Sequence, residues 1–168
     1  MVDPISPSSQ VQARILIVDD HPNTGFTLAR ILEGIRPPVE ILIALNGQEA
    51  LASVGAGVDI LIVDYLMPDM TGLELIEQLR ALPIRRPART ILISAHYSAE
   101  LVELSQRVQV DDYLVKPVYP KQIRGLVEGV LCDLQSGKVK VATNESPADQ
   151  GPSELNDAAL EQIDVHEE

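Results

Sequence analysis

The sequence predicts an α/β fold built on a parallel sheet of five strands. Short apolar runs alternate five times with segments of helical periodicity. A chain that alternates in this way folds as right-handed strand–helix–strand units around a parallel sheet. The run at residues 60–63 supports this prediction because it contains no polar residue, as in a strand with both faces buried.

The first strand and helix are expected between residue 14 and the first proline pair. An apolar strand at residues 14–18 is followed directly by Asp19 and Asp20. A helical pattern comes next and must end before Pro37, which cannot continue a helix. Two apolar stripes carry this pattern: Phe26, Ala29 and Leu32, and Leu28, Ile31 and Ile35.

The second strand and helix follow at once. Residues 39–44 are mostly apolar and predict a strand. Asn46 is a good helix cap, and Glu49 stands three residues further on. The helix that these residues open is expected to end at Gly55.

The third unit is the one around which the chain is organised. Its strand, residues 60–63, stops at Asp64, and a proline and a glycine within the next eight residues predict a turn. Thr71 and Glu74 have the spacing of a capping box, so a helix is expected from there to about Ala81. Its apolar stripe comprises Leu73, Ile76 and Leu79.

The last two units are shorter. A strand at residues 90–93 ends at Ser94, and a weaker helix is expected at residues 98–107. A strand at residues 112–115 precedes Lys116. A final helix is opened by a proline and has one apolar face: Pro120, then Ile123, Leu126, Val127, Val130 and Leu131.

Composition limits the classes of function. The 168 residues suit one domain with some excess, and a formal charge of −12 argues against a nucleic-acid surface. Cys132 is the sole cysteine, so no intrachain disulfide can form and a reducing compartment fits. No secretory signal and no apolar stretch near the roughly 20 residues of a membrane span is visible. We therefore expect a cytoplasmic protein without membrane insertion.

Charge and periodicity divide the chain into three parts. Residues 1–12 are expected to be a disordered leader, and residues 13–133 to be the folded domain. Residues 134–168 contain eight acidic and two basic residues and predict an acidic, mostly disordered tail. One short amphipathic helix could form in this tail, carried by Leu155, Ala159 and Ile163.

Chemistry-bearing residues close four of the five strands. Asp19 and Asp20 follow the first strand, Asp64 the third, Ser94 the fourth and Lys116 the fifth. In a parallel sheet these ends meet at one edge, where the carboxylates repel one another unless a cation lies between them. Hard oxygen ligands favour Mg²⁺, and a metal, an ammonium and a hydroxyl together suit phosphoryl transfer to a carboxylate. The competing interpretation is a solvated acidic rim with an unrelated lysine.

At this point the chain resembles the receiver domain of two-component response regulators, over about residues 13–133. The motifs that carry the resemblance are residues 15–20, Asp64 with residues 67–72, residues 94–95 and residues 112–117. The resemblance implies the strand order 2-1-3-4-5 with helices on both faces, as in flavodoxin-like doubly wound folds. It also implies a stand-alone regulator similar to the chemotaxis type, because no output domain is recognisable after residue 134.

The resemblance implies roles for the acidic residues. Asp64 matches the phosphoacceptor. Asp20 and Asp64 resemble direct Mg²⁺ ligands, with the backbone carbonyl of Leu66 as a third. Asp19 resembles an acidic partner that acts through metal-bound water.

The other site residues are implied in the same way. Lys116 matches the lysine that pairs with the phosphoryl group, and the Lys116–Pro117 bond resembles the family's cis peptide. Ser94 matches the hydroxyl that turns toward the phosphoryl group, and Tyr113 the aromatic residue that moves inward behind it. The expected partners are a histidine kinase or histidine phosphotransfer protein and a downstream protein that binds the surface around residues 98–133. Such a domain catalyses its own Mg²⁺-dependent phosphorylation and dephosphorylation but is mainly a signalling switch.

Two positions bear on the lifetime of the phosphorylated form. Leu66 and His96 resemble the sites that set how fast the phosphoryl group is lost. Leu66 cannot orient a water molecule, which predicts a relatively long-lived phosphorylated form. His96 is equally well explained as an ordinary surface histidine.

Three other functions share parts of this pattern. A flavodoxin-like cofactor binder needs a small, polar phosphate loop where Asp19 and Asp20 stand. A phosphatase of the haloacid dehalogenase type needs a second aspartate where Leu66 stands. A non-phosphorylated, receiver-like interaction module is the stronger rival, because the presence of the residues does not establish their use.

Overall fold

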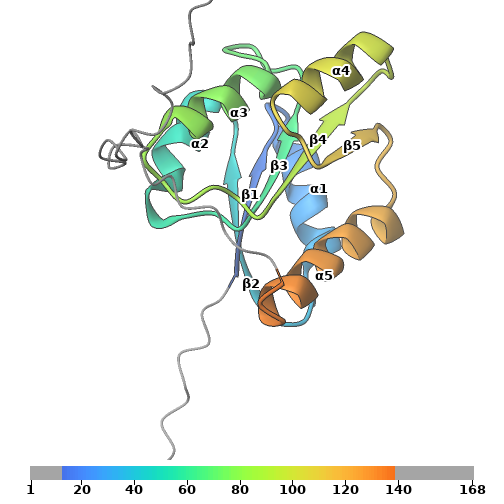
Figure 1. Cartoon of the computed structure of the whole chain (residues 1–168). Helices are drawn as coiled ribbons and strands as arrows, with labels where there is room; N and C mark the ends of the chain where they lie inside the picture. The colour runs from blue at the N-terminus through green and yellow to red at the C-terminus, as the bar shows by residue number, and fades with distance from the viewer. Residues whose placement is uncertain (1–12, 139–168) are drawn as a thin grey trace, which may run out of the picture.

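The computed structural model describes residues 13–138, which form a five-stranded parallel sheet with helices on both faces (Figure 1). The strand order is β2-β1-β3-β4-β5, as the resemblance implied. The strands are β1 (Ala13–Val18), β2 (Val39–Ala44), β3 (Ile60–Asp64), β4 (Arg89–Ser94) and β5 (Asp112–Val115). All five lie at the predicted places, and the predicted fold is confirmed.

The helices divide into two layers. They are α1 (Pro22–Leu32), α2 (Gly47–Ser53), α3 (Gly72–Ala81), α4 (Ala99–Arg107) and α5 (Pro120–Gln135). Apolar residues of α1 and α5 are buried on one face of the sheet, and those of α2, α3 and α4 on the other (Figure 1). The central strand β3 is buried along its whole length, because both layers cover it.

The predicted caps at Asn46 and Thr71 are confirmed, and a third cap is found at Ser98. The Asn46 side chain accepts a hydrogen bond from the Glu49 N–H, and Ser98 caps α4 through the Leu101 N–H. Thr71 and Glu74 form both bonds of a capping box at α3. Side-chain oxygens thus satisfy N–H groups that a helix leaves without a backbone partner.

The first helix ends before Pro37 as predicted, but it stops short of Ile35 and one of its faces differs from the prediction. It begins at Pro22 and ends at Leu32, well before Pro37. The expectation that Phe26 belongs to a core stripe is wrong, because its side chain is 61% exposed. The buried face consists of Gly25, Leu28 and Leu32, and a turn of about 100° per residue carries Phe26 away from that face.

Smaller differences concern other helix ends. The α-helical part of α2 ends at Ser53, and residues Val54–Ala56 form a 3₁₀ turn. Helix α5 continues to Gln135. Residues 1–12 and 139–168, with the predicted leader and the predicted tail helix, lie outside the described residues. Within residues 13–138, no helix is long and apolar enough to cross a membrane.

Candidate functional site

The strand ends meet as predicted at one edge of the sheet. Asp64 is the last residue of β3, and Ser94 is the last residue of β4. The register pairs Val18 with Val63 and Ser94 with Val115. The residues that follow these strands therefore emerge together, and Asp19, Asp64 and Ser94 are all buried.

Lys116 joins two of these strand ends. Its Nζ atom lies 2.8 Å from Asp64 Oδ1 and 3.3 Å from Asp19 Oδ2. The Lys116–Pro117 peptide bond is cis, as the resemblance implied. One half-buried ammonium thus pairs with two buried carboxylates that are far apart in the sequence.

Charge and burial shift the pKa values in this group. Burial raises the pKa of the Asp64 carboxyl, the hydrogen bond and charge of Lys116 oppose this, and the charges of Asp19 and Asp20 raise the pKa further. Burial alone would lower the pKa of Lys116, but its hydrogen bond and attraction to Asp64, followed by those to Asp19, raise it above the ordinary value. The site therefore holds more negative charge than its one lysine neutralises.

A third acidic residue and a histidine extend the site toward solvent. Asp19, Asp20 and His21 each offer a ligand atom, and these atoms lie within 4.8 Å of one another. The His21 Nδ1 atom lies 2.9 Å from Asp20 Oδ1, and the His21 N–H donates to Asp19 Oδ1 at 2.9 Å. Asp64 is not part of this group. His21 was not predicted from the sequence, although its position next to Asp20 was a signal.

The chemistry of the donors fits a hard divalent cation. Asp19, Asp20 and Asp64 supply carboxylate oxygens at the carboxyl ends of the strands. Burial and, to a smaller extent, the charges of Asp19 and Asp20 raise the pKa of Asp64. Such oxygen-rich sites suit Mg²⁺, which keeps several water ligands and needs few protein ligands. The side chain of Leu66 has no ligand atom, so this residue could contribute to a metal site only through its backbone carbonyl.

Ser94 and Tyr113 share one acceptor. The Ser94 hydroxyl donates to the His96 carbonyl at 3.0 Å, and the Tyr113 hydroxyl donates to the same oxygen. The ring of Tyr97 meets that of Tyr113 edge-on, with centroids 6.1 Å apart. The structure therefore brings the predicted Ser94 and Tyr113 together through the backbone of His96, a link that sequence reasoning did not find.

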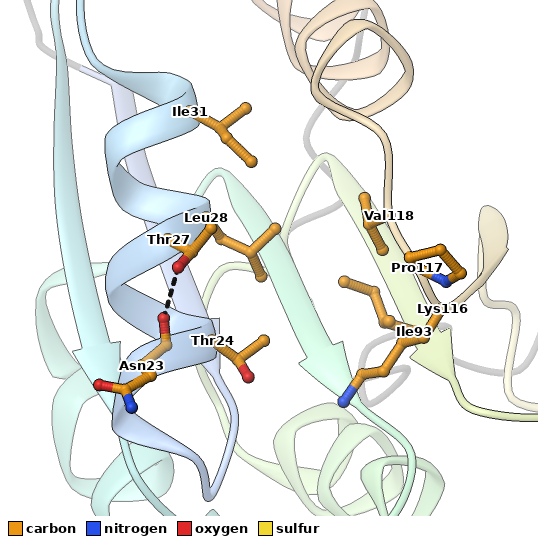
Figure 2. Close-up of a pocket in the computed structure, with 9 residues that line it drawn as sticks. All are labelled: Asn23, Thr24, Thr27, Leu28, Ile31, Ile93, Lys116, Pro117 and Val118. Carbon is orange, nitrogen blue, oxygen red and sulfur yellow. Dashed lines mark hydrogen bonds between the residues drawn. The ribbon is translucent and has the colours of Figure 1, made fainter.

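A cavity of about 430 Å³ opens beside Lys116, between α1 and the segment that joins β5 to α5 (Figure 2). Thr24, Leu28 and Ile31 on α1 face the side of the cavity that Ile93 and residues 116–118 form. The lining is mostly apolar, with the Lys116 amine at one end. The cavity therefore gives access to Lys116 from the α1 side.

Comparison with known proteins agrees with this geometry. The family model for the response regulator receiver domain matches residues 15–128. The cyclic di-GMP phosphodiesterase response regulator RpfG of Xanthomonas campestris is 33% identical over 127 residues, which are 75% of this chain and 34% of RpfG. The chemotaxis protein CheY of Treponema pallidum is 29% identical over 120 residues, 70% of this chain and 82% of CheY.

Solved structures show the same fold. A CheY-like receiver domain protein from Methanospirillum hungatei superimposes with a TM-score of 0.65 at 30% sequence identity. The match covers 75% of this chain and 98% of that protein. The chain spans only about a third of the length of RpfG.

Proposed function

The chain belongs to the response regulator receiver domain family of two-component systems, and on that basis we propose that Asp64 accepts a phosphoryl group from a phosphohistidine. The donor is a histidine kinase or a histidine phosphotransfer protein. The observation that carries the proposal is the 2.8 Å contact between Lys116 Nζ and Asp64 Oδ1 at the buried end of β3. It places a fixed positive charge beside the one carboxylate that would become an acyl phosphate.

The chemical step is a displacement at phosphorus. An Asp64 oxygen attacks the phosphorus atom, a P–O bond forms, and the P–N bond to the donor imidazole breaks. The imidazole leaves with the electron pair and takes up a proton. Lys116 pairs with the phosphoryl oxygens and replaces its contact with the free carboxylate, so charge is neutralised by a group already in place.

Mg²⁺ is the cofactor that these residues would hold. Asp20 and Asp64, the Leu66 carbonyl, and Asp19 through a water molecule are the proposed ligands. When bound, the ion neutralises charge on the carboxylates and on the phosphoryl oxygens. The raised pKa of Asp64 is consistent with this role, because burial, with a smaller contribution from the charges of Asp19 and Asp20, disfavours the free carboxylate beyond what Lys116 offsets.

The signal would leave the site through Ser94. A phosphoryl group on Asp64 offers the Ser94 hydroxyl an acceptor stronger than the His96 carbonyl to which it now donates. Movement of Ser94 would leave Tyr113 as the remaining side-chain donor to that carbonyl and shift the packing behind it. The readout surface is proposed to lie around residues 98–133 and to bind a downstream protein.

We also propose that residues 13–133 form the receiver domain and that residues 134–168 form a separate acidic segment. The test is incorporation of phosphate from a small phosphodonor such as acetyl phosphate, with Mg²⁺, into the full chain. Wild type and Asp59→Asn should be labelled, and Asp64→Ala should not. Asp59 is a matched control, since it is a second buried aspartate, just before β3 at the opposite sheet edge.

The same experiment separates the rival function. A non-phosphorylated interaction module would take up no label, and beryllium fluoride with Mg²⁺ would leave its spectrum unchanged. Equal labelling of wild type and Asp64→Ala would place the acceptor elsewhere and contradict the proposal.

A further inference from the structure

The loop after the phosphoacceptor, residues 65–71, is held at its base by backbone contacts. The Tyr65 N–H donates to the Ile93 carbonyl at 2.7 Å, and the Gly72 N–H donates to the Tyr65 carbonyl at 2.8 Å. Leu66 and Thr71 form an isolated antiparallel bridge. These bonds tie the two ends of the loop to β4 and to each other, and they leave its tip, residues 67–70, projecting beyond them.

The tip is anchored instead to helix α2, through Asp69. The Asp69 carboxylate accepts the Gln48 N–H at 3.2 Å. Burial alone would raise the pKa of Asp69, but hydrogen bonds from the Gly47 and Gln48 N–H groups, and from the amides of Asp69 and Met70, together lower it. One carboxylate therefore bonds backbone groups of both α2 and its own loop.

Met70 adds an apolar contact at the same place. A Cβ atom at Gly47 would lie 2.6 Å from Met70 Cγ, so the side chain of Met70 rests directly on the helix backbone. Met70 also packs against the core on this face of the sheet. The tip is thus seated on α2 by neighbouring polar and apolar contacts.

Helix α2 is already capped without the Asp69 contact. Asn46 already caps this helix, accepting the Glu49 N–H at 2.8 Å, and Glu49 accepts the Leu45 N–H at 2.8 Å. Asp69 takes different N–H groups, those of Gly47 and Gln48. What Asp69 adds is a connection between α2 and the phosphoacceptor loop.

We propose that Asp69 is a positioning residue for the divalent-metal site. Leu66 lies three residues before Asp69, and its exposed side chain does not anchor it. The orientation of the Leu66 carbonyl therefore depends on the backbone between the Leu66–Thr71 bridge and the tip that Asp69 holds. The inference rests on the metal-binding role proposed above for that carbonyl.

The test compares Mg²⁺ affinity in Asp69→Ala, Asp69→Asn and the matched control Asn46→Ala. Affinity is measured by titration of the Tyr65 and Leu66 amide resonances of the full chain. We expect Asp69→Ala to weaken Mg²⁺ binding by about 10-fold, the usual scale for losing a partner that orients a ligand. Asp69→Asn keeps an acceptor oxygen and should restore most of the affinity. Asn46→Ala should lower the melting temperature and leave Mg²⁺ affinity near that of wild type.

The outcomes separate this inference from the proposed function. If wild type binds Mg²⁺ and Asp69→Ala binds it equally well, the inference is overturned and the function stands. If Asn46→Ala weakens binding as much as Asp69→Ala, Asp69 acts only by stabilising α2, and the inference is again overturned. If wild type does not bind Mg²⁺, both fail.

Discussion

The Lys116 ammonium lies 2.8 Å from Asp64 Oδ1, and it also reaches Asp19 Oδ2 at 3.3 Å. One cation thereby holds together the ends of β1, β3 and β5. Without it, two buried carboxylates would face each other with no counter-charge. The contact that is proposed to prepare Asp64 for phosphoryl transfer is therefore also expected to stabilise the unmodified protein.

Replacing Lys116 with Gln should destabilise the unphosphorylated protein by about 1–2 kcal/mol, because it leaves buried carboxylates without their partner. Added Mg²⁺ should recover part of this loss, since it supplies positive charge at the same place. Urea unfolding with and without Mg²⁺ measures both effects. Lys121→Gln, at an exposed position on α5, is the control and should change neither. Equal sensitivity of the two variants would contradict the pairing.

Removing both side-chain donors to the His96 carbonyl should lower the free energy of unfolding by more than the sum of the two single losses. Ser94→Ala and Tyr113→Phe each leave one donor, and each should cost about 0.5–1.5 kcal/mol. The double variant has neither side-chain donor. Its loss in unfolding free energy should exceed the sum of the two single losses by about 0.5 kcal/mol or more. Equilibrium unfolding of the four proteins closes the cycle. Tyr119→Phe, at an exposed tyrosine, controls for the loss of a hydroxyl.

The capping box of α3 should make the stability of the protein depend on pH. Backbone and side-chain hydrogen bonds from Thr71 lower the pKa of Glu74 below 4.5. A lowered folded-state pKa contributes stability above the unfolded value that is lost as pH falls through the folded value. Glu74→Gln should therefore lower the melting temperature at pH 6, and the difference from wild type should shrink below pH 4.5. A melting-temperature difference between wild type and Glu74→Gln that stays constant from pH 6 to pH 3 would contradict this prediction.

Asp59 should matter for folding and not for phosphorylation. This buried carboxylate accepts the Arg14 N–H at 2.8 Å and pairs with the Arg85 guanidinium, at the sheet edge opposite the site. Asp59→Ala leaves both donors without their acceptor and should cost about 2–3 kcal/mol. Asp59→Asn keeps an acceptor and should cost less. Denaturant unfolding tests the order, and phosphate uptake by the folded fraction should be unchanged in both.

Leu66 should control the lifetime of the phosphorylated form. Its side chain is exposed beside the site and neither donates nor accepts a hydrogen bond, so it cannot hold the attacking water. Leu66→Asn adds groups that can orient water and should shorten the half-life of the acyl phosphate several-fold. Leu66→Met, which keeps an apolar side chain, should behave as wild type. Decay of labelled protein after removal of the phosphodonor gives the rates, and an unchanged rate in Leu66→Asn would refute the hypothesis.

The sequence by itself determined the parts of this protein that depend on near neighbours along the chain. Alternation of apolar runs located all five strands, and side-chain caps at Asn46 and Thr71 located two helix starts. Parallel strands bring their carboxyl ends to one edge, so the clustering of Asp19, Asp64, Ser94 and Lys116 was also predictable.

Only the tertiary structure decided which distant groups touch. It paired Lys116 with two carboxylates, placed Asp69 on α2, and joined Ser94 and Tyr113 at the His96 carbonyl. It also turned Phe26 to solvent, although its spacing suited a core stripe. Periodicity along the chain records which residues share a face, whereas the rotation and spacing of packed elements fix which faces and loop ends meet. This packing depends on the whole core, so no local sequence pattern predicts it.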